Sequence, residues 1–386
     1  MRLEKFMKVV CAIDSFKGSI SGIEAGEAAA LGIKDAYPDA EVVICPVADG
    51  GEGTTAAIVS GAGGELRISR VSDPLGRIID ASWGLLPSGA AVIEMSSAAG
   101  ITLVSDEERN PLESDTYGVG ELIISALDLG VRNFLIGIGG SATNDGGVGM
   151  LRALGFAFLD KNGEPIGRGA GALARLAKID ISGADKRLAE CSFTVASDVK
   201  NPLTGPLGAT YVYGPQKGVD EGTRPTLDGY LAHYASLTRS IIPDADPDMQ
   251  GAGAAGGLGF ALTSYLGAKL RSGVDVVIRA TGLEEKIRGA DFVITGEGRM
   301  DAQSAMGKLP AGIAALAKKY GKPVIALAGS VADGAEVLNE IGIDFLQSIL
   351  RAPTDLAAAM NKENAANNMR AATRQIFTLI KTIRQN

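Results

Sequence analysis

The chain has 386 residues, 46% of them hydrophobic, and a formal net charge of −8. This length exceeds what one hydrophobic core usually supports, so we expect two domains, and the hydrophobic content excludes an intrinsically disordered chain. The negative charge argues against a nucleic-acid partner. No stretch reaches the roughly 18 apolar residues of a membrane span, and no apolar signal segment opens the chain, so we expect a cytoplasmic protein without a membrane partner.

Both ends of the chain predict strands that alternate with helices. The expected elements are a strand at 8–13, a loop at 14–19, a helix at 21–36, a strand at 41–47 and a loop at 48–54, then a strand at 291–295, a loop at 296–308, a helix at 310–320, a strand at 324–328 and a loop at 329–330. Such alternation is typical of parallel sheets, whose ligands bind at the carboxyl ends of the strands. A closing helix from residue 354 onward carries an apolar stripe for packing.

The middle of the chain has a different pattern. The expected elements there are paired strands at 65–71 and 78–85, a strand at 91–94, a helix after Thr116, strands at 133–138, 155–159 and 192–196, and a helix that runs to Lys269. We therefore predict an α/β fold with two domains. A discontinuous Rossmann-like domain with a parallel sheet, residues 1–62 plus 287–386, holds an inserted mixed α/β domain, residues 63–286.

A glycine-rich loop follows the apolar run at 133–138 and holds two hydroxyl side chains, an amide and a carboxylate. Glycines let the backbone approach a ligand closely, and N–H groups at the start of a helix attract phosphate. We expect the loop to bind nucleotide phosphates; the alternative is a tight turn with a helix N-cap. The candidate nucleotide-binding residues are Gly139, Gly140, Ser141, Thr143, Asn144, Asp145, Gly146, Gly147 and, from a second glycine-rich patch at 251–259, Gly256.

Charged residues in other loops supply the remaining chemistry, because the single histidine, His233, has no neighbouring catalytic candidate. Asp198 follows a strand and is the expected general base, with an Asx turn as its alternative. Lys17 and Arg299 are expected catalytic cations that neutralise a substrate carboxylate or the moving phosphoryl group, and Lys217 is a similar candidate. The alternative for each cation is a solvated surface group.

Three carboxylates are candidate metal ligands. Asp49 and Glu52 share a loop with three glycines, and Glu297 follows a strand near the other end of the chain. Carboxylate oxygens are the ligands that Mg²⁺ prefers. For Asp49 and Glu52 the alternative is a pair of helix-capping residues.

Several loops agree at once with one known family. They lie at 14–19, 46–54, 137–149, 197–203, 214–218, 251–259 and 295–301. Together, and in order along nearly the whole chain, they resemble the bacterial glycerate kinase family. The resemblance implies a monomer or homodimer that transfers the γ-phosphoryl group of ATP, with Mg²⁺, to D-glycerate, usually giving 2-phosphoglycerate, in a cleft between two α/β domains. The substrate-binding residues implied are Asp14, Ser15, Lys17, Arg299, Asp301 and Lys217.

One segment departs from the family pattern. Relatives have Asp-Ser-Gln-Thr-x-x-Gly-Lys, often with a histidine just before Gly-Lys. Here residues 301–308 read differently at Ala302, Ser304 and Met306. We expect these changes to affect substrate specificity rather than to abolish catalysis.

Two alternative functions remain open. Residues 137–142 fit the Gly-x-Gly-x-x-Gly/Ala dinucleotide pattern after a strand, which predicts an NAD-dependent dehydrogenase of a small hydroxy acid. Against it, residues 143–147 delay the helix that should follow the glycines. The second alternative is a non-catalytic protein that binds a sugar acid or phosphate.

Overall fold

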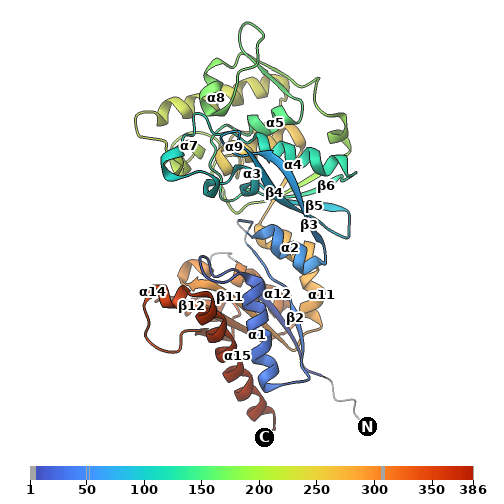
Figure 1. Ribbon diagram of the computed structural model, residues 1–386, viewed down its shortest axis with the longest axis vertical. Helices are drawn as coiled ribbons and strands as arrows, with labels where there is room; N and C mark the ends of the chain where they lie inside the picture. The colour runs from blue at the N-terminus through green and yellow to red at the C-terminus, as the bar shows by residue number, and fades with distance from the viewer. Residues whose placement is uncertain (1–5, 49, 52, 306–308, 386) are drawn as a thin grey trace. The chain divides into compact units, whose positions relative to one another are not determined.

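The computed structural model describes residues 6–48, 50–51, 53–305 and 309–385, and it divides into two compact units (Figure 1). Unit 1 comprises Met1–Asp49, Ala56–Gly63 and Val277–Asn386, and unit 2 comprises Gly50–Thr55 and Gly64–Val276. Unit 1 builds a parallel sheet from both ends of the chain, whereas unit 2 builds a mixed sheet from the middle. The expected α/β fold class is therefore confirmed. The domain boundaries at 62/63 and 286/287 stay a prediction.

The sheet of unit 1 has five parallel strands in the order β13-β12-β11-β1-β2. Its strands are β1 (Lys8–Ile13), β2 (Glu41–Ile44), β11 (Phe292–Met300), β12 (Val324–Val331) and β13 (Phe345–Ser348). The chain leads from β1 to β2 in one direction and from β11 to β13 in the other. The topological switch point, where open parallel sheets bind their ligands, thus lies between the carboxyl ends of β1 and β11.

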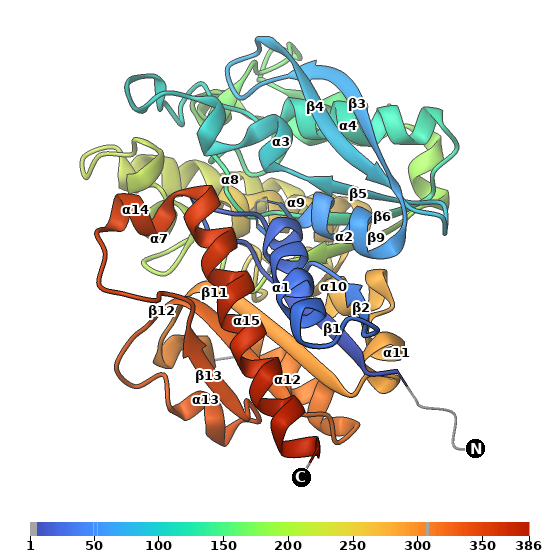
Figure 2. The ribbon, with the colours of Figure 1, turned by 60° about the horizontal axis from the view of Figure 1, so that its bottom comes forward.

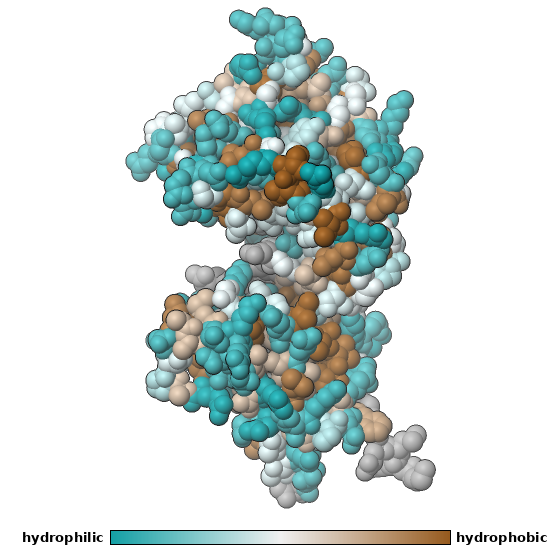
Figure 3. Space-filling model, viewed as in Figure 1, coloured by the Kyte–Doolittle hydropathy of each residue, from teal (hydrophilic) through white to brown (hydrophobic). Residues whose placement is uncertain are grey.

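The two long helices of unit 1, α1 (Gly22–Ala36) and α15 (Lys362–Gln385), lie side by side over one face of this sheet (Figure 2). The helices of this unit are α1 (Gly22–Ala36), α11 (Leu283–Arg288), α12 (Leu309–Lys319), α13 (Val337–Glu340), α14 (Leu356–Met360) and α15 (Lys362–Gln385). A Cβ atom at Gly32 of α1 would lie 2.3 Å from the carbonyl oxygen of Arg370 in α15, so only glycine permits this approach. The exposed side of α15 is mainly hydrophilic (Figure 3).

Unit 2 contains a six-stranded sheet in the order β10-β9-β6-β5-β4-β3. Its strands are β3 (Glu65–Ser72), β4 (Ile78–Leu85), β5 (Ala90–Glu94), β6 (Asn133–Gly137), β9 (Ser192–Ala196) and β10 (Lys269–Arg271), and a separate ribbon pairs β7 (Ala157–Leu159) with β8 (Lys178–Asp180). β3 and β4 are antiparallel to each other, and β5, β6, β9 and β10 run parallel. The carboxyl ends of these four parallel strands therefore share one edge.

The helices of unit 2 surround a large apolar core. They are α3 (Ser96–Ala99), α4 (Tyr117–Asp128), α5 (Val148–Ala153), α6 (Gly169–Ala172), α7 (Ala209–Tyr213), α8 (Arg224–Ile241) and α9 (Ala254–Leu266). Two further helices, α2 (Thr54–Ala62) and α10 (Gly273–Thr281), contain residues of both units. Trp83, Phe134 and Phe260 are fully buried in the core of unit 2. No helix within the described ranges combines the length and hydropathy that a membrane crossing needs.

Several expected element boundaries are wrong. The expected loop at 329–330 is part of β12, which runs to Val331, and the strand expected at 41–47 ends at Ile44. Residues 296–300 belong to β11 instead of a loop, because β11 stays paired with β12 as far as Met300 and Val331. The helix expected to reach Lys269 ends at Leu266, where Gly267 adopts φ +60°, and β10 follows. The closing helix is two helices, because Asn361 ends α14 and its side chain caps α15.

Candidate active site

A cavity of about 530 Å³ opens at the carboxyl edge of the unit 1 sheet. Its walls come from the loop after β1, the end of β11, the end of β12, the residues after β13, and α14. This is the switch point of the sheet, where a ligand site is expected from the topology. The cavity brings together five of the residues that the sequence singled out: Asp14, Ser15, Lys17, Glu297 and Arg299.

Two carboxylates stand next to each other at this edge. Ile13 of β1 pairs with Gly296 of β11, so Asp14 and Glu297 occupy adjacent positions in the register. The backbone N–H of Asp14 donates to the carbonyl oxygen of Gly296 at 2.9 Å, and Asp14 is only 8% exposed. Its Oδ1 atom accepts a hydrogen bond from the N–H of Ser15 at 2.6 Å. The backbone pairing of β1 and β11 therefore positions both acids.

The donor set at this edge suits Mg²⁺. Two carboxylates with hard oxygen atoms match a cation that keeps several waters and binds one or two carboxylates together with substrate phosphates. Among the described residues, no group of three or more His, Cys, Asp and Glu side chains is placed to enclose a metal by itself. The other predicted ligands, Asp49 and Glu52, lie outside the described residues.

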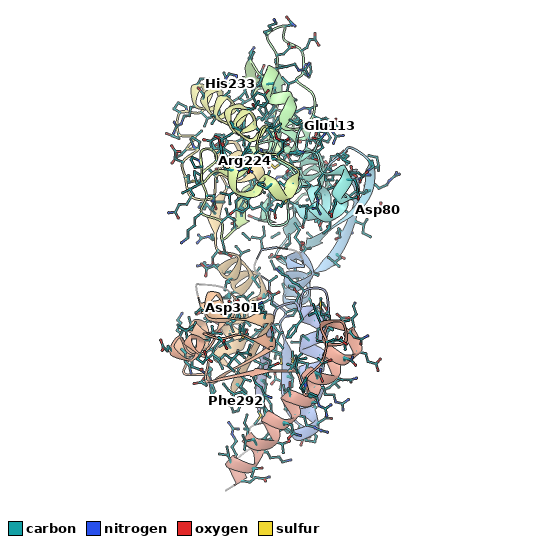
Figure 4. All side chains as sticks on the ribbon, turned by 90° about the vertical axis from the view of Figure 1, so that its left-hand side faces the viewer. Asp80, Glu113, Arg224, His233, Phe292 and Asp301 are labelled. Carbon is teal, nitrogen blue, oxygen red and sulfur yellow. The ribbon has the colours of Figure 1, made fainter. Side chains whose placement is uncertain are left out.

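Two cations lie at the same cavity, and both are exposed. Lys17 is in the loop after β1, and the Arg299 side chain is 69% exposed near the end of β11. The Nε atom of Arg299 lies 3.7 Å from Oδ2 of Asp301, whose position Figure 4 marks. An ion pair this long and this exposed contributes little, so the guanidinium remains available to an anionic ligand. The hydroxyl of Ser304, which is buried, accepts from the N–H of Asp301 at 3.3 Å.

In unit 2 the glycine-rich loop joins β6 to α5, and most of it is buried. Asp145 is 1% exposed, and its Oδ2 atom accepts from the N–H and hydroxyl of Thr116 and from the N–H of Gly149, at 2.8–3.0 Å. Its Oδ1 atom accepts from the N–H of Gly147 at 3.1 Å. Asp145 therefore holds the loop to the start of α4 and α5. Thr143 and Asn144 are also fully buried, and only Gly139 and Gly140 reach solvent appreciably.

Lys217 lies behind this loop, not on the surface. Its ammonium donates to the hydroxyl of Ser141 at 2.7 Å and to the carbonyl oxygen of Thr143 at 2.6 Å, and the residue is 2% exposed. Burial lowers the pKa of Lys217 to about 7, and the nearby charge of Asp145 opposes that shift. The alternative of a solvated surface cation is therefore wrong for Lys217, because its contacts are interior. Its assignment as a substrate ligand stays a prediction.

The second glycine-rich segment packs on the first. The N–H of Gly146 donates to the carbonyl oxygen of Gly256 at 2.9 Å. A Cβ atom at Gly256 would lie 2.0 Å from the carbonyl oxygen of Thr143. Gly256 is one of three consecutive residues, 255–257, with positive φ at the start of α9. The structure therefore brings the predicted Ser141, Thr143, Gly146, Lys217 and Gly256 into one cluster.

The carboxyl edge of the unit 2 sheet carries two acids. Asp198 is exposed just after β9, and Glu94 ends β5. Both strands pair with β6, with Glu94 opposite Gly137 and Gly137 opposite Ala196. Glu94 was missed by the sequence analysis, although it follows a buried apolar strand in the same way as Asp198.

Glu94 holds the loop that precedes α2. It is 7% exposed and accepts hydrogen bonds from the N–H groups of Gly53, at 3.1 Å, and Thr55. Burial raises the pKa of Glu94, whereas these hydrogen bonds act to lower it. His233, in contrast, is accounted for structurally: on α8 (Figure 4), its Nε2 atom lies 2.8 Å from the carbonyl oxygen of Leu176.

Comparisons with known proteins agree with one another. Residues 9–381 match the sequence model of the glycerate kinase family. The chain is 48% identical to glycerate 2-kinase of Escherichia coli K12, over 96% of this chain and 97% of that one. It is 47% identical to glycerate kinase of Bacillus subtilis 168, over 97% and 98% of the two chains. The chain belongs to the glycerate kinase family.

A crystal structure supports the same assignment. The structure, of a candidate glycerate kinase 2 from Salmonella typhimurium LT2, superposes with a TM-score of 0.90 at 43% identity, covering 99% of this chain and all of the other. The resemblance inferred from the loops is therefore confirmed. As a member of the glycerate kinase family, the chain is an enzyme that uses ATP and a small-molecule substrate.

Membership of the glycerate kinase family favours the kinase over both alternatives. The dinucleotide pattern at 137–142 does follow β6, but α5 begins only at Val148, so no helix starts where a pyrophosphate would bind. The NAD-dependent dehydrogenase and the non-catalytic binder are therefore not supported.

Proposed function

We propose that this protein transfers the γ-phosphoryl group of ATP to a hydroxyl of D-glycerate and that the product is 2-phosphoglycerate. The relatives in E. coli and B. subtilis are named glycerate 2-kinase and glycerate kinase. The observation that carries the proposal is the cavity at the switch point of unit 1, where two cations and two carboxylates meet. Phosphoryl transfer depends on such groups, because catalysis is mainly positioning and charge stabilisation.

In this proposal Asp198 is the general base. Asp198 is exposed and lies just after β9, at the carboxyl edge of the unit 2 sheet. The glycerate oxygen forms a bond to the γ-phosphorus, the bond between that phosphorus and the leaving ADP oxygen breaks, and the hydroxyl proton passes to Asp198. Lys17 and Arg299 neutralise negative charge on the moving phosphoryl group, for which the planar guanidinium is well suited.

The remaining predicted residues receive binding roles. Asp14 and Glu297 hold Mg²⁺, with Asp49 and Glu52 as further candidates. When bound, the metal neutralises charge on the phosphate oxygens. Ser15 and Asp301 are candidate ligands of the substrates. In unit 2, the exposed backbone of Gly139 and Gly140 contacts phosphate oxygens. Asn144, Asp145 and Gly147 are buried and support the backbone of Gly139 and Gly140 from the interior of unit 2.

The proposal is tested by following ADP release in a coupled assay with D-glycerate, ATP and Mg²⁺. We expect turnover with D-glycerate and none without it, and ³¹P NMR of the product should give the signal of 2-phosphoglycerate. A 3-phosphoglycerate signal would refute the regiochemistry alone. NAD-dependent oxidation of a hydroxy acid, or glycerate binding without ATP consumption, would refute the kinase.

Two secondary proposals concern the state of the protein. We propose a monomer or a homodimer, which light scattering on a sizing column distinguishes from larger assemblies. We also propose a cytoplasmic location. It is supported by the three free cysteines, of which Cys11 and Cys45 are buried, because unpaired thiols are typical of a reducing compartment.

A further inference from the structure

The cavity of unit 1 is larger than the acid acceptor needs. Its volume, about 530 Å³, falls in the range of roughly 300–1,000 Å³ typical of pockets for drug-sized ligands. A three-carbon acid with two hydroxyl groups would fill only a small part of it. The cavity therefore has the size of a nucleotide site rather than of a glycerate site.

The cavity lining contains both charged and apolar side chains. The loop after β1 and the end of β11 contribute Asp14, Lys17, Glu297 and Arg299. The apolar part of the lining includes Phe16, Ile349, Leu350, Leu356, Ala359 and Met360. Glycerate has no apolar part to bury there. A nucleotide has one, because a flat base is joined through a ribose to an anionic phosphate chain.

The apolar part of the lining includes side chains that solvent still reaches. Leu356, on α14, is 74% exposed, and Met360 is 36% exposed. A Cβ atom at Gly18 would lie 2.6 Å from Cε of Met360, so this methyl group rests against the loop after β1. Asp355 caps the start of α14, and the side chain of Asn361, the residue that ends α14, caps the start of α15. A preformed wall that leaves leucine and methionine open at a pocket is suited to a planar apolar ligand.

We infer that this cavity binds the adenosine part of ATP, with the base against Leu356 and Met360 and the phosphates toward Lys17 and Arg299. The inference rests on the proposed use of ATP as phosphoryl donor. It adds the binding site of the adenine ring, which no loop motif of the sequence indicated. It also changes the expectation for Asp14, Ser15, Lys17 and Arg299, which then bind the nucleotide instead of glycerate.

The test uses an exposed leucine with a matched control in the same unit. Leu356→Ser removes apolar contact from the cavity, whereas Leu379→Ser alters a 60% exposed leucine on α15 that does not line it. Neither side chain is buried, so both variants should fold. Titration calorimetry with ADP and Mg²⁺ should show about tenfold weaker binding for Leu356→Ser and wild-type binding for Leu379→Ser.

A second readout needs no turnover. The ¹³C-labelled methyl group of Met360, assigned by its loss in Met360→Leu, should shift when ADP is added, because the base brings an aromatic ring close to it. D-Glycerate alone should leave it unchanged. Unaltered ADP affinity in Leu356→Ser, or a Met360 signal that responds to glycerate and not to ADP, would overturn the inference.

The proposed function fails on a different result. If ADP binds, Leu356→Ser weakens that binding and the Met360 signal moves, but D-glycerate is not phosphorylated, the cavity assignment stands and the glycerate kinase reaction is refuted. If glycerate is phosphorylated and the Leu356→Ser variant keeps its ADP affinity, the reaction stands and the cavity assignment is refuted.

Discussion

Replacing Gly256 by alanine should destabilise unit 2 far more than replacing another left-handed glycine of the same helix. Gly256 has φ +68°, and a Cβ atom there would lie 2.0 Å from the carbonyl oxygen of Thr143 and 2.7 Å from Cα of Asn144. Both neighbours are backbone atoms in a fully buried loop, so they cannot move aside as a flexible side chain would. Gly267, which ends α9 with φ +60°, has nothing within 4 Å of its Cβ position.

The two substitutions separate two costs. A left-handed conformation costs a non-glycine residue about 1–2 kcal/mol, and this applies to both positions. Forcing extra volume into a packed interior adds about 1–3 kcal/mol, and this applies only to Gly256. We therefore expect Gly267→Ala to lower the free energy of unfolding by about 1–2 kcal/mol and Gly256→Ala by about 2–5 kcal/mol.

The assay is urea unfolding followed by tryptophan fluorescence. The chain has a single tryptophan, Trp83, which is 1% exposed in the core of unit 2, so the signal reports that unit. Equal slopes of the unfolding free energy against urea would show that the compared states are alike. If Gly256→Ala unfolds at the same urea concentration as Gly267→Ala, the close packing of the two glycine-rich segments is not the reason for a glycine at 256.

Three further predictions concern the charged residues. Asp198→Asn should lower kcat by about 10²–10⁴-fold with ADP affinity unchanged, and a variant that keeps most of its rate would remove Asp198 from the role of base. Arg299→Gln should weaken ADP binding without changing thermal stability, because the side chain is largely exposed; a drop in melting temperature would indicate a structural role. Burial lowers the pKa of Lys217 from 10.5 to about 7. Between these two pH values the unfolded chain therefore binds one more proton, at Lys217, than the folded chain does. Wild-type stability should therefore rise with pH between 7 and 10, by up to about 1.4 kcal/mol per unit, relative to Lys217→Met; parallel pH profiles would contradict this.

The sequence could predict the switch point but not the length of the strands beside it. The predicted strand at 8–13 has the same bounds as β1. Its apolar residues, 9–13, are all buried, so the hydrophobic pattern marks the whole strand. The strand at 291–295 was extended by the structure to Met300. Hydrophobic patterning detects burial, whereas the last residues of β11, including the polar Glu297 and Arg299, are held in the strand by backbone pairing with β12.

The depth of a charged side chain is the feature that could not be predicted locally. Lys217 lies in a polar stretch with glycines around it, which is typical of a surface turn. Its burial depends on a contact with Ser141, 76 positions away in the chain. Glu94 illustrates the reverse: the rule that singled out Asp198, a carboxylate after a buried strand, applies to it equally and would have found it.

The glycines at 139–147 can serve two different purposes, close packing in the interior and the close approach of a ligand, and a sequence motif does not distinguish them. Gly146 and Gly147 have positive φ, and side chains there would collide with Tyr234 and Ala261, so these glycines serve packing in the interior of unit 2. Gly140 also has positive φ, yet it is exposed at the carboxyl edge of β6, and its nearest neighbour would be the Cβ of Ser96 at 3.4 Å. Close packing therefore accounts for the end of the loop and not for its beginning. A ligand role is best sought at Gly139 and Gly140, while the buried acid that follows them keeps their backbone in place.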